Sequence, residues 1–560
     1  MRFPFVGAND VAANGRRATC PAHRSIDLSI RRVPNDALPE ANYRGRVSIP
    51  PASIRVTEVL AALSLTTDLA TGAPFEKGLA TCLVATSLAE RIGLDEADRR
   101  TVFHAALLGA VGCTSRASEN AASFADDVAF QRAYHVLDPG DTPVFAAQLA
   151  QFGSWAPDSQ ALLRDRFVTT TPTHAAAAVR SVCEVSRALG PRLGLPEAAV
   201  VALTEVKERW DGLGAPQRLQ GEAISLTGRI VHVAEQAVLA AAERGRRGAA
   251  EELRRRAGGH LDPELVALFA ADADAVWDCL DVPDVLTAVV HGEPGVPLRI
   301  RPGERLQLCL ALAIVVDLKG RWLLGHSGHV ADLAGGAAEL CGMDPGDRDA
   351  LRAAALLHDI GRVGVSSAIW DRPGPLGPGD WERVRLHTYW TERVLRRCPG
   401  LADLADIAAG HHERLDGSGY HRGIRGRDLS KPARILAAAD VFAALTEPRP
   451  YRPAFSPDDA ARELLDAASA GNLDREACAA VVEATGLRKP RTDLPCGLTE
   501  RELDVLRLAA RGLSNRQIAT QLVLSERTVG HHLAHIYDKT GRRTRAGAAV
   551  FAMEHGLLPE

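Results

Sequence analysis

The stretch "LLHDIGRVG", Leu356 to Gly364, places a histidine beside an aspartate within a run of apolar residues. An earlier stretch, "LLGAVGC" from Leu107 to Cys113, has the same apolar frame but lacks the two polar residues. The chain therefore contains an internal repeat, and the polar pair marks a difference between its two copies.

Longer segments around the two phrases also align. Residues 68–112 match residues 317–361, and the segment "ERWDGLG" with its continuation, from Glu208, matches "ERLDGSG" and its continuation, from Glu413. Both copies show apolar residues at helical spacing, as at Val330, Leu333 and Ala334, and Gly342 is the expected helix stop. Each copy is predicted to be an all-helical domain.

Length and composition limit the class of protein. The 560 residues exceed what one hydrophobic core normally supports. With 66 basic and 70 acidic side chains, the whole chain has no charge bias toward nucleic acid or membranes. The apolar run from Leu308 to Val316 is too short to span a bilayer. Ten scattered cysteines without a CxxC pair favour a reducing compartment, so we expect a cytoplasmic protein.

Stretches rich in proline, glycine and charge divide the chain. We expect a polar leader at 1–50, a first helical copy at 51–290, a linker at 291–304, a second copy at 305–488, a linker at 489–497 and a C-terminal domain at 498–560.

The second copy gathers imidazole and carboxylate side chains, which bind divalent transition metals. A lone histidine on an apolar helix is usually a core or surface residue, and an HD dipeptide often occurs by chance. Seven such residues in one copy favour a metal centre instead. The seven are His326, His358, Asp359, His387, His411, His412 and Asp440.

The surroundings of these residues are "LLHDIGRVGV", "RLHTYWTERVL", "HHERLDGSGYH" and "ILAAADVFAALTEPRPYRP". Over most of residues 305–490 the chain resembles the HD-GYP family of bacterial metal phosphohydrolases. The resemblance implies a helical HD domain with two divalent ions, iron or manganese, bridged by Asp359, and a cyclic dinucleotide such as c-di-GMP as substrate. It implies one ligand set of His326, His358 and Asp440, and another of His387, His411 and His412.

Three positions depart from the family pattern. Arg362 stands where the family has lysine, His421 where it has proline, and Trp322 where members with a third metal carry glutamate. We expect Arg362 to act in catalysis by holding a substrate phosphate through its paired donors. Gly419 and Tyr420 are candidate substrate contacts, with an ordinary turn as the alternative for Tyr420.

The first copy lacks the corresponding ligands. The positions aligned with His326, His358, Asp359, His411, His412 and Asp440 are Lys77, Gly109, Ala110, Val206, Lys207 and Glu235. His174, opposite His387, is the remaining candidate ligand. We expect a degenerate HD-type domain without metal that packs on the active copy, regulates it, or binds a ligand without cleaving it.

From Leu498 the chain reads "LTERELDVLRLAARGLSNRQIATQLVLSERTV". Thr499 with Glu502, and Ser514 with Gln517, form capping-box patterns at two helix starts. The segment resembles the LuxR-type helix-turn-helix domain of four helices, which binds DNA. By that resemblance the candidate DNA contacts are Arg527, Thr528, His531 and His535 toward the bases, and Asn515, Arg516 and Lys539 toward the phosphates.

Basic side chains only slightly outnumber acidic ones in this domain, so one copy is expected to bind DNA weakly and a homodimer to bind it well. Two functions remain open from the residues. The first is a metal-dependent phosphodiesterase whose state alters DNA binding. The second is a one-component transcriptional regulator whose HD domain senses a nucleotide or a metal with little or no catalysis. Metal content and hydrolysis of a cyclic dinucleotide distinguish them.

Overall fold

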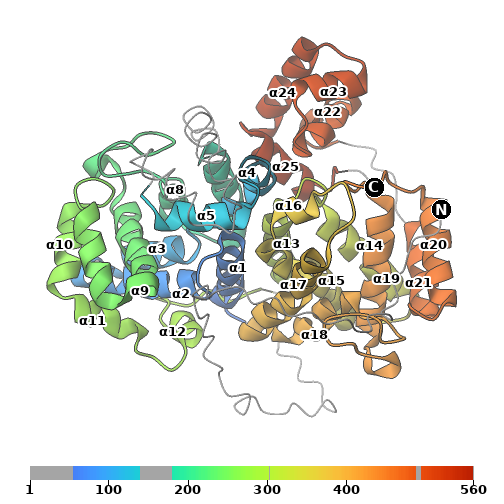
Figure 1. Ribbon diagram of the computed structural model, residues 1–560, viewed down its shortest axis with the longest axis horizontal. Coiled ribbons are helices and arrows are strands. Elements are labelled where there is room, and N and C mark those ends of the chain that lie inside the picture. The colour runs from blue at the N-terminus through green and yellow to red at the C-terminus, as the bar shows by residue number, and fades with distance from the viewer. Residues whose placement is uncertain (1–53, 139–178, 302, 487–493, 559–560) are drawn as a thin grey trace, which may run out of the picture. The chain divides into compact units, whose positions relative to one another are not determined.

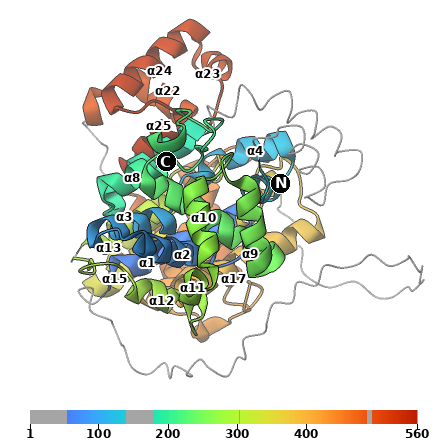
Figure 2. The same cartoon turned by 90° about the vertical axis from the view of Figure 1, so that its left-hand side faces the viewer.

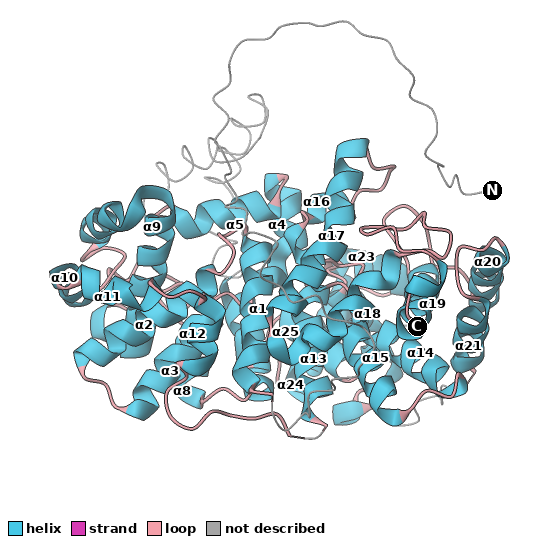
Figure 3. Cartoon of the chain, turned by 90° about the horizontal axis from the view of Figure 1, so that it is seen from below, coloured by secondary structure: helices cyan, strands magenta, loops and turns pink. Residues whose placement is uncertain are grey.

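The computed structural model describes residues 54–138, 179–301, 303–486 and 494–558. Within these ranges the regular elements are α-helices and 3-10 helices, joined by loops (Figure 3). Three isolated β-bridges are also present. The predicted all-α class is confirmed. The expected leader at 1–50, His174 and most of the linker at 489–497 lie outside the described residues.

The first copy is built from ten described α-helices, seen in blue to light green in Figure 1 and facing the viewer in Figure 2. They are α1 (Val56–Thr71), α2 (Lys77–Ile92), α3 (Glu96–Leu107), α4 (Ala117–Phe124), α5 (Asp127–Val136), α8 (Glu197–Leu203), α9 (Leu226–Arg256), α10 (Pro263–Ala271), α11 (Ala273–Trp277) and α12 (Val285–His291).

The second copy follows after a helix-free stretch, of which residue 302 is not described. Its helices are α13 (Glu304–Asp317), α14 (His326–Leu340), α15 (Pro345–Leu357), α16 (Ser367–Trp370), α17 (Pro378–Arg397), α18 (Ala405–Ala409), α19 (Lys431–Thr446), α20 (Pro457–Ser469) and α21 (Arg475–Thr485). Two short 3-10 helices, Ile360–Gly364 and Gly410–His412, complete the part that carries the site.

Equivalent helices of the two copies begin in the same way. Lys77 is the first residue of α2 and His326 the first residue of α14, and a left-handed residue precedes each of them. In the second copy Asp317 accepts hydrogen bonds from the backbone nitrogen and hydroxyl of Ser327. In the first copy Asp68 likewise accepts a hydrogen bond from the nitrogen of Gly78. The repeat read from the sequence is therefore also a repeat of local structure.

Packing of apolar helix faces explains why these segments are helical. In α14, Val330, Leu333 and Ala334 are buried, as their spacing predicts, and the chain turns at Gly342 with a φ of 66°. Residues of both copies join one continuous hydrophobic cluster. No helix in the described ranges is long and apolar enough to cross a membrane.

The C-terminal segment forms four helices, as predicted: α22 (Glu500–Ala510), α23 (Asn515–Leu522), α24 (Glu526–Thr540) and α25 (Arg545–Glu554). Both predicted capping boxes are present, at Thr499 with Glu502 and at Ser514 with Gln517. The turn between α23 and α24 consists of Val523, Leu524 and Ser525. A second hydrophobic cluster holds these four helices together.

Candidate metal centre and DNA-binding face

The predicted ligands of the second copy lie on five elements that meet in the interior. His326 begins α14, His358 is the C-cap residue just after α15, and Asp359 directly follows it. The other four are His387 in α17, His411 and His412 in the 3-10 helix Gly410–His412, and Asp440 in α19. All except the half-buried His412 are at most 6% exposed. The structure thus brings together side chains from a segment of more than 100 residues.

One group of ligand atoms contains His326, His358 and Asp440. An oxygen of Asp440 lies 3.2 Å from Nε2 of His326 and 3.8 Å from Nε2 of His358. The three side chains offer ligand atoms that all lie within 4.8 Å of one another, which suits one cation.

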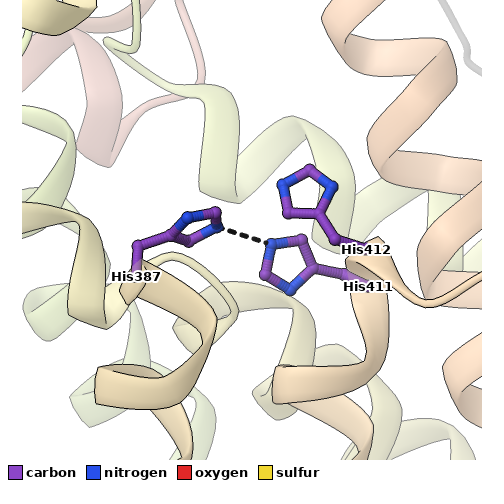
Figure 4. A group of neighbouring side chains, drawn as sticks. All are labelled: His387, His411 and His412. Atoms are coloured by element: carbon purple, nitrogen blue, oxygen red, sulfur yellow. Dashed lines mark hydrogen bonds between the residues drawn. The ribbon is translucent and has the colours of Figure 1, made fainter. Parts of the chain in front are cut away.

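The second group contains His387, His411 and His412, whose rings converge in Figure 4. Nε2 of His387 lies 3.2 Å from Nε2 of His411. The ring centres of His411 and His412 are 4.2 Å apart. His411 and His412 are consecutive residues of the 3-10 helix Gly410–His412, and both offer ligand atoms within 4.8 Å of each other and of one on His387.

Asp359 lies between the two groups. One carboxylate oxygen is 3.6 Å from Nε2 of His358 in the first group. The other oxygen is 3.4 Å from Nε2 of His387 and 3.6 Å from Nε2 of His411 in the second. This second oxygen is buried and accepts no hydrogen bond from the residues that the structure describes. A buried carboxylate oxygen without a donor fits a cation, and its position fits a ligand shared by two.

Backbone contacts orient the imidazoles toward the centre. Nδ1 of His358, His387 and His411 lies within 2.7 Å of the carbonyl oxygens of Ala355, Val384 and Ala408 respectively, so each Nδ1 carries the proton and donates it. Each Nε2 then keeps its lone pair and faces the cluster. This arrangement is typical of metal-binding histidines.

His326 is oriented by a carboxylate that the sequence analysis did not identify. Its Nδ1 lies 2.9 Å from Oε2 of Glu447, which also accepts a hydrogen bond from Arg449 at 3.0 Å. The other oxygen of Glu447, Oε1, lies 3.2 Å from Nδ1 of His329. Glu447 follows the last residue of α19, two helical turns after Asp440 and therefore on the same side. The seven-residue spacing from Asp440 could therefore have identified Glu447 from the sequence.

Burial and charge set the protonation of the cluster. Burial, together with the neighbouring His358, lowers the pKa of His411 to about 3, so its imidazole is neutral and available as a ligand. Burial would raise the pKa of Asp359, but Arg362 and the nearby imidazoles hold it well below its ordinary value. At His326 burial opposes protonation, yet Glu447 and Asp440 raise the pKa to about 10. Binding a cation at His326 would therefore release a proton.

The candidate substrate residues lie beside this centre. Arg362 donates a hydrogen bond to Asp359 at 2.6 Å, and its guanidinium group stacks 3.8 Å from the ring centre of Trp370. The ring of Tyr420 packs on that of His412, with ring centres 4.7 Å apart. A Cβ added to Gly419 would lie 2.5 Å from backbone atoms of the loop that begins at Glu413, so this glycine has a structural role.

The first copy has a different centre at the aligned positions. The ammonium group of Lys77 lies 2.5 Å from a carboxylate oxygen of Glu235; the Lys77 side chain is buried and that of Glu235 is 13% exposed. Nδ1 of His135 lies 3.7 Å from the same oxygen. Among the described residues, every group with the geometry of a metal site belongs to the second copy.

In the C-terminal domain, α24 presents Arg527, His531 and His535 as exposed side chains, and Thr528 is half-buried beside Ser525. Arg516 in α23 is also exposed. Two of the expected phosphate contacts have partners within the domain instead. The side-chain oxygen of Asn515 accepts a hydrogen bond from Arg545. Lys539 donates to the carboxylate of Glu502 and to the backbone carbonyl of Gly497.

Comparisons with known proteins agree with this description. The family model "HD domain" matches residues 141–265 and 311–477, and thus parts of both copies. The model "Bacterial regulatory proteins, luxR family" matches residues 497–552. The chain is 30% identical over 452 residues to the 3'3'-cGAMP-specific phosphodiesterase 3 of Vibrio cholerae, with 79% of this chain and 97% of that protein covered.

Two further relatives are similar. A cyclic di-GMP phosphodiesterase of Thermotoga maritima is 40% identical over 141 residues, which are 25% of this chain and 38% of that one. A crystal structure of a cyclic GMP-AMP specific phosphodiesterase of V. cholerae, V-cGAP3, is 26% identical and has a TM-score of 0.54 over 78% of this chain and 99% of its own. The chain belongs to the HD-domain family, as a protein of the HD-GYP type that carries a LuxR-type domain at residues 497–552.

Proposed function

We propose that the second copy hydrolyses a 3',3'-linked cyclic dinucleotide and that the LuxR-type domain couples this activity to transcription. The observation that carries the proposal is the buried carboxylate of Asp359 between two groups of imidazoles. The relatives named as cyclic dinucleotide phosphodiesterases support the substrate class. The relative that matches across both copies is named for cGAMP, so cGAMP is the first candidate substrate and c-di-GMP the second.

The site residues divide the work of phosphodiester hydrolysis. His326, His358 and Asp440 would hold one divalent ion, and His387, His411 and His412 the other, with Asp359 shared and iron or manganese as the metal. When bound, the two ions supply an activated hydroxide and neutralise charge on the phosphoryl group. Arg362 lies beside Asp359 with a fixed guanidinium plane, which suits two donors for a phosphate oxygen. Tyr420, whose ring packs on that of His412, is a candidate contact for a substrate base.

The test uses the full-length protein loaded with manganese or iron under anaerobic conditions. It is incubated with cGAMP, c-di-GMP and cyclic mononucleotides, and the products are separated by chromatography. We expect linear dinucleotides or mononucleotides from a cyclic dinucleotide, and none from the Asp359→Asn protein. Glu463→Gln, an exposed change in α20, is the matched control. A metal-loaded protein that binds these nucleotides without cleaving them would favour the one-component regulator.

For the DNA-binding part we propose a homodimer on an inverted repeat. The exposed side chains of α24, Arg527 and His531 among them, are placed to enter a major groove, and two such helices on adjacent half-sites would add their contacts. Arg527→Ala should weaken binding to a selected site far more than binding to random DNA. Arg516→Ala should weaken both alike and reduce the salt dependence. Equal binding by both variants and the parent would contradict this assignment.

A further inference from the structure

A buried polar network joins the two copies at a place outside the metal centre. Asp127 is the first residue of α5 in the first copy and is fully buried. Its carboxylate pairs with the ammonium group of Lys319 at 2.5 Å, and it accepts hydrogen bonds from the hydroxyl of Ser366 at 3.0 Å and the backbone nitrogen of Ser367 at 2.7 Å. These three partners all belong to the second copy.

Two partners of Asp127 also bind each other. The carbonyl oxygen of Lys319 accepts a hydrogen bond from the hydroxyl of Ser367 at 3.0 Å, and Lys319 is only 1% exposed. A buried ion pair holds its geometry when additional hydrogen bonds satisfy both partners, as here, and removing one partner leaves an uncompensated charge. Asp127 therefore fixes the start of α16, whose N-cap residue is Ser366.

Helix α16 ends next to the candidate metal centre. Its last residue, Trp370, carries the guanidinium group of Arg362 on its face at 3.8 Å. The ring of Trp370 also meets that of His387 at 5.9 Å in an edge-to-face arrangement. Arg362 in turn donates to Asp359. A series of direct contacts thus leads from a carboxylate of the degenerate copy to the aspartate shared by both ligand groups.

We infer that Asp127 is a positioning residue for the reaction. By holding α16, the degenerate copy would set Trp370 and, through it, the direction of the Arg362 guanidinium. Helix α4 of the first copy packs against α16 as well, so the support comes from two helices of that copy. The inference rests on the proposed phosphodiesterase function, and it assigns the first copy a role that needs no ligand of its own.

The test compares the parent with Asp127→Asn and with the double variant Asp127→Leu/Lys319→Met, which removes both charges and leaves neither one buried alone. Each protein is also made with Trp370→Phe. Three quantities are measured: metal content, kcat and KM for the cyclic dinucleotide, and acrylamide quenching of the Trp370 fluorescence, taken as the difference from the Trp370→Phe partner. Glu76→Gln is the matched control, because it breaks the ion pair with Arg397 between the copies without touching α16.

We expect the Asp127 variants to keep their metal and to lose roughly 10- to 100-fold in kcat/KM, with stronger quenching of Trp370. The loss should largely vanish in the Trp370→Phe background, where the route to Arg362 is already cut. Glu76→Gln should match the parent. Unchanged kinetics and quenching in both Asp127 variants, or an equal loss with and without Trp370, would overturn the inference. A parent protein without hydrolysis would refute the proposed function instead, and the quenching would still decide whether Asp127 holds α16.

Discussion

The two copies share a scaffold and differ at its centre. The loop after Glu208 in the first copy and after Glu413 in the second is held alike, because each glutamate accepts hydrogen bonds from backbone nitrogens further along its loop. Gly214 and Gly419 each approach the backbone so closely that a Cβ would lie 2.5 Å away. Loop and helix packing have thus been retained where metal ligands have not.

The centres show what replaced the ligands. In the second copy Nε2 of His326 faces a carboxylate oxygen of Asp440 at 3.2 Å, and in the first copy the ammonium group of Lys77 faces Glu235 at 2.5 Å. A lysine side chain brings its own positive charge to a buried carboxylate, so the first copy needs no cation there. The comparison teaches that an ammonium–carboxylate pair can occupy the place in the fold where the second copy gathers its candidate metal ligands.

The largest expected effect comes from removing the shared aspartate. Asp359→Ala should lower phosphodiesterase turnover on the order of 1,000-fold or more and reduce the bound metal, because water activation at neutral pH depends on the ions. Elemental analysis and product chromatography check this. A variant with full metal content and full turnover would show that the two groups of imidazoles do not form the reactive centre.

The ion pair of the first copy provides the second test. Lys77→Met should destabilise the protein by about 3 to 5 kcal/mol, because Glu235 would lose its ammonium partner in a largely buried position. Thermal unfolding of the metal-loaded protein measures the change. The double variant Lys77→Met/Glu235→Leu should recover most of the loss, and bound metal should stay at the parent level in both. If Lys77→Met lowers the bound metal, the ion pair of the first copy affects metal binding by the second copy.

A smaller effect is expected at Glu447, the carboxylate that contacts Nδ1 of His326. Glu447→Gln should weaken metal affinity roughly 10- to 100-fold, since it loses the charged acceptor for Nδ1 of His326. Competition with a chelator measures the affinity, and Glu447→Asp should restore part of it. The aligned residue of the first copy is Ala242, and Ala242→Ser should leave metal content unchanged. Equal affinities of the Gln variant and the parent would remove Glu447 from the centre.

The smallest effect, which is no change at all, is expected at His174, the candidate ligand that the first copy keeps opposite His387. His174 lies outside the described residues. The residues of the first copy that align with its expected partners His411 and His412 are Val206 and Lys207, which cannot complete a metal site with it. His174→Ala should therefore change neither metal content nor turnover, as measured by elemental analysis and product chromatography. The loss of one metal equivalent would show that the first copy also binds an ion.

Much of the site could be predicted because its residues carry strong local signals. His358 and Asp359 directly follow a helix whose apolar period is visible in the sequence. The capping boxes at Thr499 and Ser514 depend on residues only three positions apart. The repeat added information, since alignment of the copies showed lysine and glutamate where the second copy has His326 and Asp440. Their pairing in the first copy could have been anticipated from that alignment.

The sequence by itself determined the all-helical class, the two copies, the candidate ligands and the helix-turn-helix, because periodicity and capping are properties of short segments. Only the tertiary structure decided that Glu447 supports His326, that Lys77 meets Glu235, and that Asp127 holds the helix leading to Trp370. Asp127 and its partners are separated by 192 to 240 residues along the chain. Such contacts depend on how the helices pack, and no local pattern records the packing of two copies against each other.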